Sequence, residues 1–141
     1  MEEVLIQCSP GISGDMLLGA FYDLGVPRSV IEQPLKDLKL DNLYRLKFIE
    51  SKSCSIRGIN VHVEKIESSL KKRNWQGIKK LIINSKLDKE FQKIIYKVFE
   101  SLAIAEGNVH GINPEEFHFH EICSIYSLVD IIGVCAAINY L

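Results

Sequence analysis

Closely spaced cysteines are absent from this sequence. The four cysteines, Cys8, Cys54, Cys123 and Cys135, stand far apart, and no Cys-x-x-Cys pair occurs. This spacing excludes a zinc ribbon and does not suit a disulfide framework, so it favours a reducing compartment. The acidic residues 2–3 also depart from the basic start of a secretory signal. We therefore expect a cytoplasmic protein.

An excess of charge of one sign is also missing. Lys and Arg total 17 and Asp and Glu total 18, which gives a net charge of −1. Such a chain has no overall field that would attract nucleic acid or an anionic membrane. We interpret the basic run at residues 71–73 as a solvated loop. The longest apolar stretch, residues 128–141, contains Asp130 and Asn139 and is too short to span a bilayer. We expect neither nucleic acid nor a membrane as a partner.

The glycine-rich turn at residues 9–15 has no phosphate-binding lysine, and its spacing matches neither the P-loop nor the Gly-x-Gly-x-x-Gly motif. Glycines still let backbone N–H groups approach a ligand, and a helix start favours negative charge. Gly11, Ser13, Gly14 and Asp15 are therefore candidate cofactor-binding residues. A structural explanation is also sufficient, in which Ser13 caps the helix and Asp15 lies in its first turn. Asp15 would repel a phosphate unless a cation lay between them.

Three segments have the pattern of strands. The chain has 141 residues, 47% of them hydrophobic and 25% charged, which is enough for one domain with a sizeable core. Residues 4–8 form an apolar run typical of a buried strand. Residues 44–50 and 59–64 alternate between polar and apolar, and we expect them to pair as antiparallel neighbours.

Helical periodicity covers most of the remaining chain, at residues 16–24, 29–38, 75–85, 88–109 and 124–141. Asp88 is the expected N-cap of the longest helix, and Gly111 its C-terminal stop. Residues 113–116 resemble a short helical start. We predict a single α+β domain over residues 1–141, with an α/β-like start and a small sheet of about three strands covered by five or six helices.

The final helix, residues 124–141, is apolar on most faces and ends without a capping residue. It resembles a helix that is built to be buried. We expect a further domain or a partner chain to cover it, and a two-fold homodimer is the simplest such partner.

Histidines gather in one short segment. His110, His118 and His120 fall within eleven residues, and Glu121 follows directly. In extended backbone, residues two apart point to the same face, so His118 and His120 can converge on one target. Two imidazoles and a carboxylate suit Zn, Ni, Fe or Cu better than Ca or Mg. The alternative is that these histidines only form hydrogen bonds in a partly buried turn.

Asp130 is a carboxylate in an otherwise apolar helix, with Val129 and Ile131 on either side. A buried carboxylate needs a partner, which a histidine or a metal would supply. It could also merely orient a histidine or cap neighbouring backbone. We expect Asp15 and Asp130 to approach the same cleft as the histidines, so that His118, His120, Glu121 and Asp130 form the candidate metal site.

Three segments carry a resemblance to a known family. They are residues 8–16 (CSPGISGDM), 105–111 (AEGNVHG) and 118–133 (HFHEICSIYSLVDIIG). In this order and at this separation they resemble the nickel-insertion protein family of the nickel-pincer nucleotide pathway. The resemblance runs through nearly all of the chain and corresponds to the family's N-terminal domain.

The resemblance implies a cytoplasmic nickel chelatase that matures the cofactor of lactate racemase. Such proteins insert nickel into a pyridinium dithiocarboxylate mononucleotide, forming carbon–nickel and sulfur–nickel bonds in a CTP-dependent reaction. The resemblance associates CTP, with Mg or Mn, with a C-terminal domain that residues 1–141 do not contain. It therefore implies two partners, the nickel-pincer nucleotide precursor and that C-terminal domain, in the same chain or as a second chain. We expect residues 1–141 alone to be inactive as a chelatase.

The chain departs from the family pattern at several positions. Gln7 stands where the family has an acidic residue, Ser9-Pro10 where it has Phe-Ser, and Tyr126 where it has an aspartate. Residues 68–75 carry no histidine, although many members have a histidine-rich loop there. These departures support an alternative function, a metal-free binding or scaffold domain that has kept the fold and lost the metal chemistry. A phosphate- or nucleotide-binding enzyme that uses the Gly11–Gly14 turn is the third class.

Overall fold

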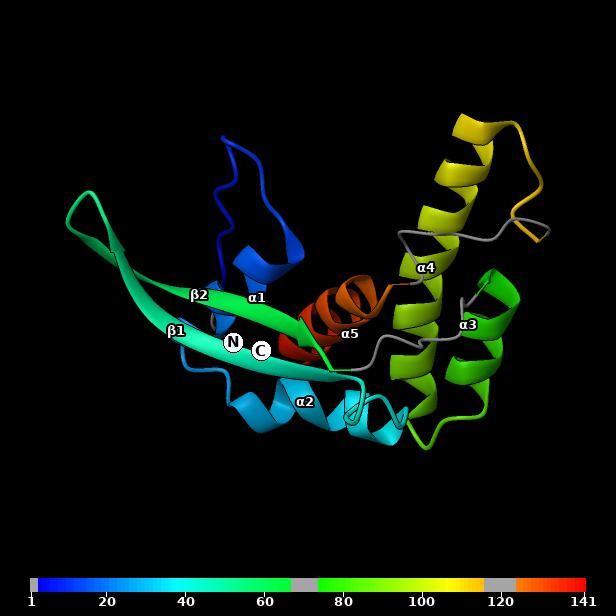
Figure 1. The fold of residues 1–141 in the computed structure, drawn as a ribbon, viewed down its shortest axis with the longest axis horizontal. Helices are drawn as coiled ribbons and strands as arrows, with labels where there is room; N and C mark the ends of the chain where they lie inside the picture. Colours follow the sequence, from blue (N-terminus) through cyan, green and yellow to red (C-terminus); the bar gives the residue numbers. More distant parts are fainter. Residues whose placement is uncertain (1–2, 67–73, 116–123) are drawn as a thin grey trace.

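The computed structural model describes residues 3–66, 74–115 and 124–141. Within these ranges the fold is α+β, as predicted, with five helices and one antiparallel sheet of two strands rather than about three. None of these helices is long and apolar enough to cross a membrane. In chain order the elements are α1 (Gly14–Asp23), α2 (Arg28–Asp37), β1 (Tyr44–Ser53), β2 (Ile56–Lys65), α3 (Trp75–Ile83), α4 (Lys89–His110) and α5 (Ile125–Tyr140) (Figure 1).

The predicted buried strand at residues 4–8 is wrong. This segment has no regular secondary structure and is exposed along its length. A buried strand needs a neighbouring strand, and among the described residues no backbone hydrogen bond joins this segment to the free edge of β1 or β2. The sequence pattern therefore identified a strand-forming segment whose pairing partner does not lie within the described part of the chain.

The β1–β2 hairpin forms as predicted, and each strand is ten residues long. Its register runs from Tyr44 opposite Lys65 to Ser53 opposite Ile56. The two turn residues, Cys54 and Ser55, have positive φ angles of 47° and 67°, as a type I′ hairpin turn requires. One face of the hairpin turns its apolar side chains toward the helices, while the other carries polar side chains, including the exposed His62.

Helix α5 lies in the middle of the domain, between the hairpin with α1 and α2 on one side and α4 with α3 on the other (Figure 1). Its buried side chains include Ile125, Leu128, Val129 and Ile132. The domain itself therefore covers most of this helix, which explains its apolar composition without an outside partner. It exposes large apolar side chains only near its two ends, at Tyr126 and from Ile138 onward. A homodimer through α5 stays a prediction. Its main reason was that an apolar α5 needs cover from outside the domain, and this reason no longer holds.

Two glycines let the central helices approach closely. A Cβ on Gly19 of α1 would lie 2.3 Å from the carbonyl oxygen of Ile59 in β2. A Cβ on Gly133 of α5 would lie 2.9 Å from Leu18 Cδ2 and 3.0 Å from Ile31 Cγ2. The 2.3 Å contact with backbone excludes a side chain at position 19, and the contacts at position 133 are tighter than nearly all real Cβ contacts. The absence of Cβ atoms at these two positions therefore lets α1 pack closely against β2 and α5. This packing holds the start of α1 beside α5.

The ends of α4 agree with the sequence prediction. The Asp88 carboxylate accepts hydrogen bonds from the backbone N–H groups of Glu90 and Phe91, at 3.0 and 3.2 Å. Gly111 ends the helix in the left-handed conformation, with φ 66°. The predicted short helical start that follows is a turn as far as it is described, where the Glu115 N–H donates to Asn113 Oδ1 at 3.0 Å.

The end of α2 offers a site for stabilisation. The backbone N–H of Leu40 donates to the Leu35 carbonyl at 2.9 Å, and that of Lys39 to the Lys36 carbonyl at 2.8 Å. This is the Schellman pattern, and it holds Lys39 at φ 57°, where glycine is normally preferred. Gly25 occupies the equivalent position after α1, at φ 108°.

We expect Lys39→Gly to raise the free energy of unfolding by about 0.5–1 kcal/mol, because it removes left-handed strain that exceeds the entropic cost of glycine. Urea denaturation would measure the change. The control is Lys36→Gly, three residues earlier within α2, which should lower stability by about 1 kcal/mol. Loss of stability in both variants would contradict this account of the helix end.

Candidate metal centre

The start of α1 holds the first group of predicted site residues. Ser13 is the N-cap residue, with extended backbone at φ −122° and ψ 166°, but its hydroxyl caps no backbone N–H. It donates instead to Asp15 Oδ1, which also accepts the Met16 backbone N–H at 2.8 Å. Before the helix, Gly11 has φ 100°, and its N–H donates to the Cys8 carbonyl at 2.9 Å. The Asp15 carboxylate is thus held on the exposed first turn of the helix.

Asp130 of α5 lies directly against this helix start. A Cβ added to Gly14 would lie 2.4 Å from Asp130 Cβ and 2.9 Å from Asp130 Oδ2. The aspartate side chain therefore fills the space that any other residue at position 14 would need. Asp130 therefore lies beside the helix start that carries Asp15. The cleft that these two carboxylates are expected to share with the histidines stays a prediction. The sequence analysis took Gly14 as a place where a ligand could approach the backbone, whereas the structure puts the Asp130 side chain there.

The Asp130 carboxyl group is in an unfavourable electrostatic position. Burial raises its pKa from the ordinary 3.8 to about 6, and repulsion from the Asp15 carboxylate adds to the increase. Its Oδ1 atom is buried and has no hydrogen-bond partner among the described residues. A buried acceptor without a partner costs free energy, and so does a neighbouring like charge. A bound cation would relieve both costs.

The other predicted metal ligands, His118, His120 and Glu121, lie outside the described residues, as does Cys123. The described chain resumes at Ser124, the N-cap of α5, whose Oγ accepts the Ser127 backbone N–H at 3.3 Å. Asp130 lies six positions after this cap. Within residues 3–66, 74–115 and 124–141, no group of three His, Cys, Asp or Glu side chains is arranged to hold a metal ion. The shared metal site therefore stays a prediction.

The remaining two histidines lie on other elements. His62 is exposed on the polar face of the hairpin, opposite Lys47. His110 ends α4, with its Nε2 atom 3.7 Å from the Glu106 carboxylate one turn earlier. These two positions provide matched controls for substitutions of His118 and His120.

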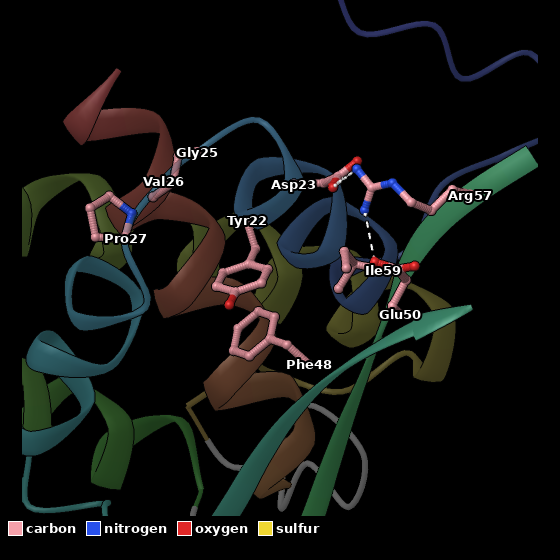
Figure 2. Close-up of a pocket in the computed structure, with 9 residues that line it drawn as sticks. All are labelled: Tyr22, Asp23, Gly25, Val26, Pro27, Phe48, Glu50, Arg57 and Ile59. Atoms are coloured by element: carbon pink, nitrogen blue, oxygen red, sulfur yellow. Dashed lines mark hydrogen bonds and ion pairs between the residues drawn. The ribbon is translucent and has the colours of Figure 1, made fainter. Parts of the chain in front are cut away.

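An open depression of about 560 Å³ lies between the end of α1 and the hairpin, and sequence reasoning did not find it (Figure 2). The Arg57 guanidinium reaches Asp23 at 2.6 Å and Glu50 at 3.5 Å, so two carboxylates already neutralise it. The rings of Tyr22 and Phe48 stack nearby, with centroids 4.2 Å apart. The ion pairs of Arg57 explain the local packing. Because two carboxylates neutralise this guanidinium, it is not available to bind a phosphate.

Comparison with known proteins shows which family the chain belongs to. The model of the family described as nickel insertion protein matches residues 4–141. The chain belongs to the nickel insertion protein family. The matched region includes the start of α1 and all of α5, so both Asp15 and Asp130 lie within family sequence.

Individual relatives are similar along the whole chain. One from Gloeothece citriformis, named for nickel insertion, is 39% identical over 147 aligned residues, which cover 96% of this chain and 36% of the relative. One from a Synechococcus species is 37% identical over 141 residues, with 100% and 36% coverage. The pyridinium-3,5-bisthiocarboxylic acid mononucleotide nickel insertion protein of Staphylococcus epidermidis is 38% identical over 140 residues, with 99% and 35% coverage. This chain thus spans about a third of the length of these family members. No solved structure gives a significant match.

Proposed function

We propose that this chain is the N-terminal, nickel-gathering domain of a nickel insertion protein. In this proposal Asp130, His118, His120 and Glu121 hold the nickel ion before its transfer. Gly11, Ser13, Gly14 and Asp15 form the adjoining rim, where the acceptor of the nickel would bind. The observation that carries the proposal is the buried Oδ1 of Asp130, which has no partner among the described residues and faces a second carboxylate close by.

The chemistry of the proposed ligands suits nickel as the ion to be delivered. Neutral imidazoles and carboxylates bind first-row transition metals, and affinity in such sites rises toward nickel and copper. Asp130 must be ionised to bind the metal, so binding below its raised pKa would release a proton. Two negative carboxylates without a described cation favour a divalent ion more strongly than either one alone.

The reaction of the full-length protein is a further part of the proposal. The printed name of the Staphylococcus epidermidis relative supports a pyridinium bisthiocarboxylic acid mononucleotide as the acceptor of the nickel. We propose that CTP, with Mg or Mn, acts through the part of the family protein that lies beyond this chain, since this chain spans about a third of its relatives. The proposed compartment is the cytoplasm.

A metal-free scaffold is the competing function. Tyr126, one turn before Asp130, stands where the family resemblance implies an aspartate, and its side chain is exposed. A scaffold would retain Asp130 only as a packed side chain against Gly14. The two functions predict opposite results for metal binding by the isolated domain.

Isothermal titration with Ni²⁺ tests the proposal. We expect binding heats for the wild-type chain that vanish in His118→Ala/His120→Ala, because both imidazoles of the proposed site are removed. The matched control is His62→Ala/His110→Ala, which removes the other two histidines and should bind nickel like the wild type. Absence of binding by the wild type would favour the scaffold. Equal binding by both double variants would remove residues 118 and 120 from the site.

A further inference from the structure

Large apolar side chains gather on the surface at the beginning of the chain. Leu5 is 82% exposed and Met16 is 59% exposed, and at least 45% of each of the other three side chains is exposed. We call this group the N-terminal apolar surface, and it consists of Val4, Leu5, Ile6, Ile12 and Met16. Scattered exposed apolar residues are ordinary, but five within thirteen consecutive residues are more than scatter and suit a contact surface.

The backbone of the same segment is also free to pair. Among the described residues, no backbone hydrogen bond joins residues 3–7 to any other segment. The side chains of Val4 and Ile6 have high strand propensity, and the run has the pattern of a buried strand. Figure 1 draws this segment (dark blue) as a coil and not as a strand of the sheet. A strand-forming segment with exposed apolar side chains and unpaired backbone groups is a template for strand addition.

The N-terminal apolar surface is continuous with the candidate metal centre. Met16 follows Asp15 in α1, and its backbone N–H donates to the Asp15 carboxylate at 2.8 Å. Ile12 immediately precedes Ser13, whose hydroxyl donates to the same carboxylate. Any partner that covers Ile12 and Met16 would therefore also lie beside Asp15 and exclude water from its carboxylate.

We propose that the N-terminal apolar surface is where the remaining part of the nickel insertion protein docks. That part supplies an apolar edge strand that pairs with residues 4–8. Two facts select this occupant. The family match begins at residue 4, so the unpaired segment belongs to the shared family sequence. The relatives are nearly three times as long as this chain, since the aligned region is 36% of their length, so each family molecule contains further chain from which such a strand can come.

The docking proposal rests on the proposed function only in taking this chain as one part of the longer family protein. Its failure is distinguishable, because nickel binding by the isolated chain needs no partner. Docking predicts that substitutions in the N-terminal apolar surface leave the nickel titration of the isolated chain unchanged and weaken only the association with the second part.

The test uses two separately purified chains: this one, and the portion of the Staphylococcus epidermidis relative outside the 140 matched residues. Titration calorimetry should detect binding by the wild type, weakened at least tenfold in Leu5→Asp/Ile6→Asp. The matched control is Ile83→Asp/Ile104→Asp, which changes two other exposed apolar residues, at 58% and 50% exposure, on α3 and α4. It should bind like the wild type. Circular dichroism should show that both variants keep the wild-type melting temperature.

Hydrogen exchange gives a second readout, since strand pairing should slow amide exchange at residues 4–8 when the second chain is added. The proposal is overturned if the wild type does not bind, or if the control double variant weakens binding equally. It is also overturned if the isolated chain self-associates and Leu5→Asp/Ile6→Asp abolishes that association, because the occupant is then a second copy.

Discussion

Gly19→Ala is expected to lower the free energy of unfolding by about 2–3 kcal/mol, the cost of forcing extra volume into a packed interface. The new Cβ would lie 2.3 Å from the backbone carbonyl oxygen of Ile59. Backbone in a paired strand cannot rotate away as a flexible side chain can, so α1 must move as a whole. The sign of the stability change is informative. Without the contact with Ile59, alanine would stabilise the helix relative to glycine by about 1 kcal/mol.

Chemical denaturation would measure this loss, and Gly58→Ala is the matched control. Gly58 lies in β2, one residue from Ile59, and a Cβ there would meet no atom within 4 Å. Its substitution should change stability by no more than about 0.5 kcal/mol. If Gly19→Ala were as stable as the wild type or more stable, the close contact of α1 with β2 would be wrong.

Asp130→Asn is expected to stabilise the metal-free protein at neutral pH and to weaken its nickel binding. A carboxyl group whose pKa is raised to about 6 in the folded protein favours folding while it is protonated. That contribution is complete below the ordinary pKa of 3.8 and is lost as the pH rises through about 6. Asparagine is never charged, so its advantage over aspartate should grow between pH 4 and pH 7.

Thermal melts across this pH range measure the difference between the two proteins. Allowing for the partial exposure of the carboxyl group, we expect Asp130→Asn to be more stable at pH 7 by about 1 kcal/mol, or roughly 3 °C in Tm. The gap should close near pH 4. Asp41→Asn, on an exposed loop, is the control and should show a much smaller change with pH. A gap that widens as the pH falls would contradict the burial and repulsion at Asp130.

The same substitution should reduce nickel affinity by about 10- to 100-fold, as loss of a metal-site carboxylate does elsewhere. Opposite signs for stability and binding would identify a residue retained for its ligand rather than for packing. The scaffold function predicts the gain in stability without any effect on metal. Unchanged nickel affinity in Asp130→Asn would remove this residue from the proposed site.

Much of the fold followed from local sequence signals. The Asp88 cap, the Gly111 stop and the alternation in the two hairpin strands act within a few residues, so the sequence alone predicted them correctly. The strand predicted at residues 4–8 is wrong because strand formation does not depend on local sequence alone. Their strand pattern is local, but a strand forms only where a neighbouring strand pairs with it, and within the described ranges neither edge of the hairpin pairs with this segment.

In the candidate site, too, local features could be predicted from the sequence, whereas contacts between distant segments could not. The apolar neighbours of Asp130 in the sequence indicated that its charge costs free energy when buried, because a charge in such a helix needs a partner. Its contact with Gly14 could not be predicted, since it depends on how α1 crosses α5, which the glycines at 19 and 133 help to set. Likewise, the apolar composition of α5 could not show whether its cover came from its own domain or from another chain.

The central claim is that His118 and His120 join the Asp130 region around one nickel ion. X-ray absorption spectroscopy of the nickel-loaded chain tests it most directly, because scattering from imidazole rings differs from that of carboxylate and water oxygens. We predict imidazole in the first coordination sphere of the wild type and of His62→Ala/His110→Ala, and its loss in His118→Ala/His120→Ala. A nickel spectrum without imidazole in the wild type, or one unchanged in His118→Ala/His120→Ala, would contradict the claim.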